Sequence, residues 1–129
     1  MAVNKNIRIM IVDDYATMLR ILRNLLKQLD FSNVDEASDG EDALRKLQTN
    51  GQYDLIISDW NMQPMTGIEF LKRVRADDKL KHIPFIMVTA ESKAENVVAA
   101  KQAGVSNYIV KPFNAETLKA KMSSVLGPI

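Results

Sequence analysis

The sequence predicts an α/β fold in which helices cover both faces of one parallel sheet. Short apolar runs without inside–outside alternation recur along the chain, which is typical of strands buried on both faces. Between these runs, apolar residues recur at helical spacing. Strand and helix patterns alternate five times, and right-handed crossovers place such helices on both sides of the sheet.

Four strand candidates are rich in β-branched residues and bounded by polar or turn residues. They are expected at 7–12 (IRIMIV), 54–58 (DLIIS), 84–88 (PFIMV) and 107–110 (NYIV). A fifth candidate at 33–37 (NVDEA) has mixed polarity, which favours an edge position in the sheet.

Apolar stripes and end signals predict the helices between these strands. Thr66 and Glu69 have the spacing of a capping box, as do Ser92 and Glu95, and Gly104 is a typical helix terminator. The stripes consist of Met18, Leu22, Leu25, Leu26 and Leu29; Ala43, Leu44 and Leu47 in a helix from about Gly40 to Asn50; Ile68, Leu71 and Val74; and Leu118, Met122 and Val125.

Length and composition indicate one globular domain spanning residues 1–129. Apolar residues make up 47% of the chain and charged residues 26%, which argues against disorder. Lys and Arg total 17 against 16 Asp and Glu, so bulk charge favours neither a nucleic acid nor a membrane as partner. The chain has no cysteine, no signal-peptide pattern and no apolar run near the roughly 18 residues of a spanning helix, so we expect a cytoplasmic protein.

Reactive or polar side chains follow the predicted strands. Asp13 and Asp14 come after the first strand, Asp59 after the third, Thr89 after the fourth and Lys111 after the fifth. In open parallel sheets, ligands bind at the carboxyl ends of the strands. Asp59 alone is explained better by a turn than by a site, but five such residues at one edge of a sheet predict a site.

Three carboxylates in one pocket require a counter-charge. Two unit charges about 4 Å apart interact by roughly 4 kcal/mol at an effective dielectric constant of about 20, so the site must either bind a proton or bind a cation. Hard oxygen ligands favour Mg²⁺ over zinc. Lys111 supplies a fixed cation and Thr89 a hydroxyl, which completes the set of groups needed for phosphoryl transfer to a carboxylate.

The motifs "VDD", "SDWNMQPMTG", "VTA" and "VKPF" resemble those of receiver domains of two-component response regulators. The match covers nearly the whole chain, in order and spacing, and is nearest to the single-domain chemotaxis regulators. The resemblance implies a flavodoxin-like, doubly wound, five-stranded sheet of order 2-1-3-4-5. It further implies a signalling protein that catalyses its own phosphorylation and dephosphorylation, with no output domain.

The resemblance also assigns roles to the acids. Asp59 is implied to accept a phosphoryl group from the phosphohistidine of a sensor histidine kinase. Asp14, Asp59 and the backbone carbonyl of Asn61 are implied to bind Mg²⁺, with Asp13 acting through water. The backbone amides of Trp60, Asn61 and Ala90 are implied to hold the phosphoryl oxygens, together with the side chains of Lys111 and Thr89.

Thr89 and Tyr108 are implied to form a switch that alters the surface of the fourth helix, fifth strand and fifth helix. The family pattern also implies a cis Lys111-Pro112 bond. Gln63 separates Met62 from Pro64, a departure from the common family pattern, so we expect the adjoining loop to differ in shape from the family's usual one.

The implied partners are a histidine kinase and the flagellar motor switch protein, with a monomer as the expected state. A phosphorelay shuttle or phosphate sink, acting on a phosphotransfer protein, is the alternative function. A flavodoxin is disfavoured because Asp13 and Asp14 would repel a phosphate in the absence of metal. A haloacid-dehalogenase-type phosphatase is disfavoured because it needs an acid where Asn61 stands. A degenerate receiver, which binds partners without being phosphorylated, is disfavoured because it would not need Asp14, Asp59, Thr89 and Lys111.

Overall fold

The computed structural model describes residues 4–90 and 94–128 and contains one five-stranded parallel sheet of order β2-β1-β3-β4-β5. The predicted fold class and strand order are confirmed. The strands are β1 (Ile9–Val12), β2 (Val34–Ala37), β3 (Leu55–Asp59), β4 (Phe85–Thr89) and β5 (Asn107–Val110). The helices are α1 (Ala16–Gln28), α2 (Gly40–Thr49), α3 (Gly67–Ala76), α4 (Ala94–Gln102) and α5 (Ala115–Leu126).

Two strands end one residue later than their apolar runs predict. Asp59 is the last residue of β3 and Thr89 is the last residue of β4, so both belong to the sheet itself. The main-chain pairing of Asp59 with Val88 extends the ladder beyond the apolar run. Each side chain is therefore fixed by a strand and not by a loop.

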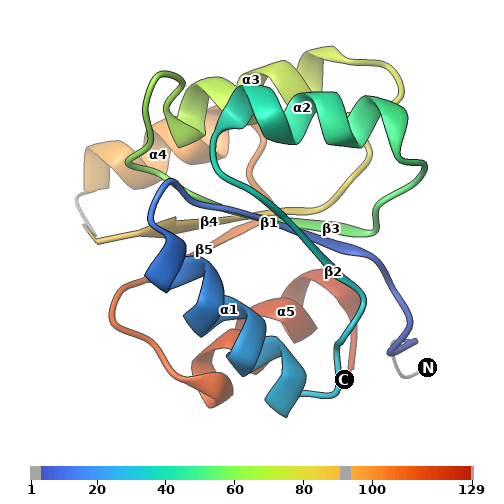
Figure 1. Cartoon of the computed structure of the whole chain (residues 1–129). Helices are drawn as coiled ribbons and strands as arrows, with labels where there is room; N and C mark the ends of the chain where they lie inside the picture. Colours follow the sequence, from blue (N-terminus) through green and yellow to red (C-terminus); the bar gives the residue numbers. More distant parts are fainter. Residues whose placement is uncertain (1–3, 91–93, 129) are drawn as a thin grey trace.

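The helices cover the two faces of the sheet unequally. Figure 1 shows α2, α3 and α4 on one face and α1 with α5 on the other. Alternate residues of the central strands divide accordingly: Met10 and Val12 pack with the first layer, and Ile9 and Ile11 with the second. Because both faces of β1 are buried, its sequence shows no inside–outside alternation.

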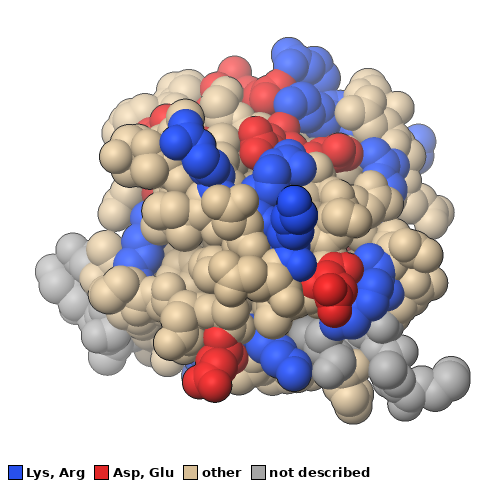
Figure 2. Space-filling view, turned by 60° about the horizontal axis from the view of Figure 1, so that its bottom comes forward, with Lys and Arg blue, Asp and Glu red and all other residues tan. Residues whose placement is uncertain are grey.

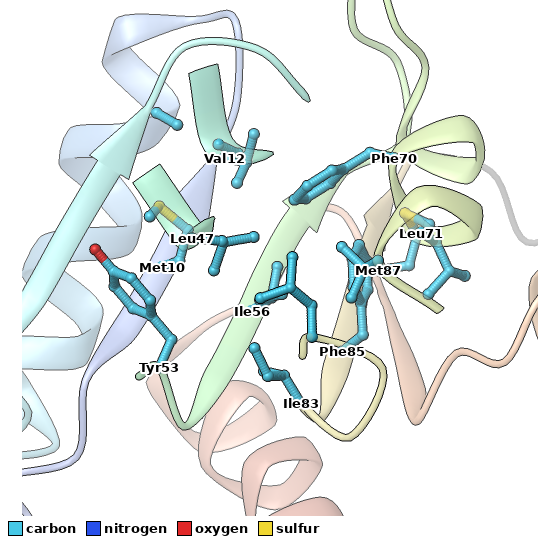
Figure 3. Packing of buried hydrophobic residues seen from close by; sticks show 14 of the residues in the cluster. Met10, Val12, Leu47, Tyr53, Ile56, Phe70, Leu71, Ile83, Phe85 and Met87 are labelled. Atoms are coloured by element: carbon cyan, nitrogen blue, oxygen red, sulfur yellow. The ribbon is translucent and has the colours of Figure 1, made fainter. Parts of the chain in front are cut away.

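The core on the α2–α3 side is a single cluster of buried side chains. Figure 3 shows Met10, Ile56 and Met87 of the sheet together with Phe70 and Leu71 of α3. The ring centroids of Phe70 and Phe85 lie 5.4 Å apart in a tilted arrangement. The methionines at 10, 87 and 122 are fully buried, so they fill the core.

The helix-end signals are largely confirmed. Thr66 and Glu69 form the predicted capping box, and Gly104 adopts φ +95° just after α4. The predicted Ser92–Glu95 cap lies outside the residues whose side chains the structure describes. In α1 the buried residues are Leu19, Leu22 and Leu26, while Met18, Leu25 and Leu29 of the predicted stripe are half-buried.

Strand β2 lies at the edge of the sheet, as its mixed polarity predicted. Its central residues Asp35 and Glu36 are half-buried and form ion pairs with Arg8 (2.9 Å) and Arg23 (2.8 Å). On the face shown in Figure 2, basic and acidic side chains are interspersed. Among the described residues, no helix has the length and apolar character needed to cross a membrane.

Candidate functional site

The strand order brings Asp13 and Asp59 together at the carboxyl ends of the strands. β1 and β3 are neighbours in the sheet, and their register pairs Val12 with Ser58, so the next residue on each strand is an aspartate. Asp14 comes directly after Asp13 in the sequence. One carboxylate oxygen from each of these three aspartates lies within 4.8 Å of the others. The predicted acidic cluster is therefore present.

Two of the three acids are removed from solvent. Asp13 is 1% exposed and Asp59 is 5% exposed, whereas Asp14 is exposed. Oδ1 of Asp13 accepts a hydrogen bond from the backbone N–H of Tyr15 (2.9 Å), but Oδ2 is buried without a partner among the described residues. Buried polar atoms are almost always satisfied, so this oxygen is a candidate ligand atom for a cation.

Burial disfavours the charged form of both acids. Burial, together with the nearby Asp59 charge, raises the pKa of Asp13 from 3.8 to about 6, although the Tyr15 N–H and Lys111 oppose the shift. Burial likewise raises the pKa of Asp59, against the lowering influence of Lys111. The site therefore carries negative charge that the protein alone compensates incompletely.

Lys111 supplies the one counter-charge that the described residues bring to Asp59. Its ammonium Nζ lies 3.0 Å from Oδ1 of Asp59, and the lysine side chain is 26% exposed. Lys111 directly follows β5, and its backbone N–H donates to the carbonyl of Thr89 on β4 (2.8 Å). The side chain thus reaches past β4 to β3.

The three acids fit a divalent oxygen-loving cation. They offer only carboxylate oxygens, one of them buried and without a partner in the described part of the chain, and they converge within a few ångströms. This donor chemistry suits Mg²⁺ better than a softer metal. Asp13, Asp14 and Asp59 are therefore the candidate ligands.

The predicted phosphoryl-binding amides directly follow two strands. Trp60 and Asn61 come after β3, and Ala90 comes after β4. The N–H of Trp60 donates to the carbonyl of Val88 (2.9 Å), so it takes part in the sheet. The phosphoryl-binding roles of these amides stay predictions, as does metal binding by the Asn61 carbonyl.

Thr89 and Tyr108 lie along one narrow gap. A cavity of about 10 Å³ is lined by both residues and by Trp60 and Asn96. Thr89 is buried, while Tyr108 is half-buried and its ring lies 5.0 Å from the ammonium of Lys121. The predicted switch residues are therefore neighbours of the acidic site and of α5.

Gly67 is a positioning residue that the sequence did not reveal as such. Its N–H donates to the carbonyl of Trp60 (2.8 Å), and an added Cβ would lie 2.2 Å from the Asp59 carbonyl oxygen. Helix α3 thus begins directly against the backbone of Asp59. The sequence signal that could have indicated this role is the position of Gly67 directly after Thr66, the predicted N-cap of the helix.

The loop between β3 and α3 contains Gln63, the residue that separates Met62 from Pro64 and departs from the common family pattern. Its Gln63-Pro64 bond is cis, and Met62 and Met65 on either side are buried. The Lys111-Pro112 bond is also cis, in agreement with the resemblance.

Comparison with known proteins decides the family. The family model described as "Response regulator receiver domain" matches residues 9–123, which include the acidic cluster and Lys111. The chain belongs to the response regulator receiver family. The geometry described above is therefore that of a receiver pocket, built from the same strand ends that the motifs indicated.

Several chemotaxis proteins are similar to this receiver. The chemotaxis protein CheY-3 of Vibrio cholerae is 53% identical over 122 residues, which cover 95% of this chain and 93% of that protein. CheY of Pseudomonas aeruginosa is 52% identical over 118 residues, or 92% of this chain and 94% of that protein.

Solved structures confirm the receiver fold. CheY4 of Vibrio cholerae superimposes with a TM-score of 0.87 at 37% identity, covering 94% of this chain and 99% of that one. The receiver domain of a histidine kinase from Syntrophus aciditrophicus superimposes with a TM-score of 0.83 at 28% identity, covering 93% of this chain and 89% of that one. This receiver is therefore of the CheY type in both sequence and fold.

Proposed function

We propose that this receiver is a phosphorylation-activated response regulator in which Asp59 accepts a phosphoryl group from a histidine kinase. The observation that carries the proposal is the placement of Asp59: it is buried, 3.0 Å from Lys111, and clustered with Asp13 and Asp14. A structural ion pair would need only one acid. Three converging acids and a lysine match the requirements of phosphoryl transfer.

In the transfer step, a carboxylate oxygen of Asp59 attacks the phosphorus of a phosphohistidine. An oxygen–phosphorus bond forms, the nitrogen–phosphorus bond breaks, and the departing imidazole recovers its proton from solvent. Lys111 holds a phosphoryl oxygen in place of the carboxylate oxygen that it now contacts. Asp14, Asp59 and the backbone carbonyl of Asn61, with Asp13 acting through water, would hold Mg²⁺, which would supply positive charge to offset the phosphoryl oxygens.

Thr89 and the neighbouring amides complete the phosphoryl site in this proposal. The Thr89 hydroxyl donates to a phosphoryl oxygen because it ends the strand adjacent to Asp59. Later attack by water on phosphorus breaks the same oxygen–phosphorus bond and releases inorganic phosphate. The burial of Asp59 limits the access of water to this bond.

The signal leaves through the surface formed by α4, β5 and α5. The phosphoryl group carries about −1.5 to −2 of charge in place of the single negative charge of ionised Asp59, and its oxygens draw Thr89 toward Asp59. The gap shared by Thr89 and Tyr108 then changes shape, and the tyrosine ring moves relative to α4 and to Lys121 of α5. The change is a shift between two states, driven by the difference in their free energies.

The acceptor is tested by labelling with acetyl phosphate and Mg²⁺, followed by peptide mapping. Label is expected on Asp59, and Asp59→Asn should abolish it. Asp54→Asn, at the opposite end of β3, is the matched control and should label normally. Undiminished labelling of Asp59→Asn would show that another residue is the acceptor.

The relatives named as chemotaxis proteins favour the flagellar motor switch as target. The alternative remains a phosphorelay shuttle or phosphate sink. Beryllofluoride-treated and untreated protein can be compared in pull-downs with a motor switch protein and a histidine-phosphotransfer protein. Beryllofluoride-dependent capture of the switch protein would support the motor role, and preferential capture of the phosphotransfer protein would support the shuttle.

A further inference from the structure

A second concave site lies at the opposite end of the sheet from the acids. A cavity of about 410 Å³ is bounded by the end of α2, the segment before β3 and the segment between α3 and β4. The five residues of β3, at about 3.3 Å each, separate it from Asp59 by about 17 Å. The cavity is therefore distinct from the receiver pocket.

The floor of this cavity is apolar. It is formed by Leu47, Tyr53, Leu80 and Ile83, each exposed by 5% or less. In Figure 3 the Tyr53 hydroxyl is turned away from Ile83, and it donates to Asp35 (2.5 Å). Because this hydroxyl is engaged elsewhere, an occupant meets hydrocarbon on the floor and would have to be apolar there.

The rim of the cavity includes the ammonium of Lys79 and the imidazole of His82. Lys79 and His82 both line it and both are exposed. Within residues 4–90 and 94–128, Lys79 Nζ has no ion pair. Asp78, the acid on the rim, is 93% exposed and lies 3.2 Å from the ammonium of Lys81. Its negative charge is thus solvated and partly offset, which leaves Lys79 available to an anion.

We propose that this cavity is a binding site for a small aromatic carboxylate. The aromatic ring would lie against the floor of Leu47, Leu80 and Ile83, and the carboxylate would lie at the rim beside Lys79 and His82. An apolar lining with a few polar groups at the mouth, in a volume of several hundred Å³, is the usual construction of a small-molecule site. The proposal goes beyond phosphorylation and is independent of it.

The test uses ¹⁵N-labelled full-length protein titrated with 1-naphthoate, and with 2-naphthol as the uncharged probe. Saturable shifts are expected for amides at 47–53 and 78–83. Gln48→Trp places a large ring over the mouth from an exposed helix position and should abolish these shifts. Gln28→Trp, at the exposed end of α1, is the matched control and should bind as the wild type does.

Charge selectivity is tested by Lys79→Gln against Lys72→Gln, an exposed lysine of α3. Lys79→Gln should weaken naphthoate binding by about two- to fivefold and leave 2-naphthol unchanged. Lys72→Gln should change the binding of neither 1-naphthoate nor 2-naphthol. Absence of saturation, shifts centred elsewhere, or normal binding by Gln48→Trp would overturn the site. Equal naphthoate affinity in Lys79→Gln would overturn the proposed ligand class.

Discussion

The ammonium of Lys111 lies 3.0 Å from Oδ1 of Asp59, although Asp59 ends β3 and Lys111 follows β5, two strands that are separated by β4. If the lysine couples the phosphoryl group to the output surface, Lys111→Ala should still accept phosphate from acetyl phosphate. It should fail to gain partner affinity on phosphorylation. Pull-down of labelled protein measures this, with Lys72→Ala, an exposed lysine of α3 outside the output surface, as a control for charge. Wild-type affinity in labelled Lys111→Ala would contradict the coupling role.

The raised pKa of Asp13 predicts how stability depends on pH without metal. Because the folded state binds the proton more tightly than the unfolded state, stability falls as pH rises from about 4 to 6 and stays lower above that. A pKa rise from 3.8 to about 6 corresponds to about 3 kcal/mol at most. Asp13→Asn should therefore be about 1–3 kcal/mol more stable than the wild type near neutral pH in EDTA.

Urea denaturation at about pH 4 and about pH 7.5 checks this prediction. The stability gained by Asp13→Asn over the wild type should be smaller at the lower pH. Asp78→Asn replaces an acid that is 93% exposed and serves as the control. Saturating Mg²⁺ should favour the wild type. An Asp13→Asn variant less stable than the wild type in EDTA at the higher pH would contradict the effect of burial.

Metal binding should be visible in the fluorescence of Trp60, the single tryptophan, which directly follows Asp59. Mg²⁺ titration should change its emission. Asp14→Asn should weaken the apparent affinity by at least about tenfold, since even groups that only orient a metal ligand contribute that much. Glu41→Gln, an exposed change in α2, should leave the titration curve unchanged. A Mg²⁺ response that persists unaltered in Asp14→Asn would remove that residue from the site.

Gly67 should tolerate no side chain. The added Cβ of Gly67→Ala would lie 2.2 Å from the Asp59 carbonyl oxygen and 2.8 Å from Trp60 Cα, so the backbone must move. We expect a loss of about 3 kcal/mol or more in the free energy of unfolding. Gly127→Ala meets nothing within 4 Å and should cost only about 1 kcal/mol, because of its φ of +103°. Similar losses in thermal denaturation for both variants would count against the close approach.

Arg75 joins α3 to the end of α4. Its guanidinium donates to the carbonyls of Gly104 (2.9 Å), Lys81 (3.0 Å) and Ile83 (2.6 Å), and the residue is half-buried. Arg75→Met should leave these acceptors without their donor and cost about 2–3 kcal/mol.

Hydrogen exchange in Arg75→Met should accelerate at 102–106 and at 81–85. The latter segment begins in the loop that bounds the cavity of about 410 Å³. Arg73→Met changes an exposed arginine of the same helix and should leave exchange in both segments as in the wild type. Unchanged exchange in Arg75→Met would show that other contacts hold the end of α4.

The helices and strands, most core positions and the residues of the acidic cluster could be predicted from the sequence because local patterns specify them. Buried strands such as β1 lack alternation, the Thr66–Glu69 cap has a fixed spacing, and parallel strands bring their carboxyl ends to one edge. The residues at those ends, Asp13, Asp59 and Lys111, follow from chain order alone. Such signals involve only a few neighbouring residues, so they can be recognised without knowledge of the tertiary structure.

Other features depend on segments that are distant in the sequence, so only the folded chain decides them. The adjacency of β1 and β3 leaves Asp13 Oδ2 buried and without a partner among the described residues. The packing of α3 on the end of β3 makes Gly67 irreplaceable, and the meeting of residues near 50 and near 80 creates the second cavity. Burial, close approach and cavity shape arise from contacts between elements, and no local pattern specifies them.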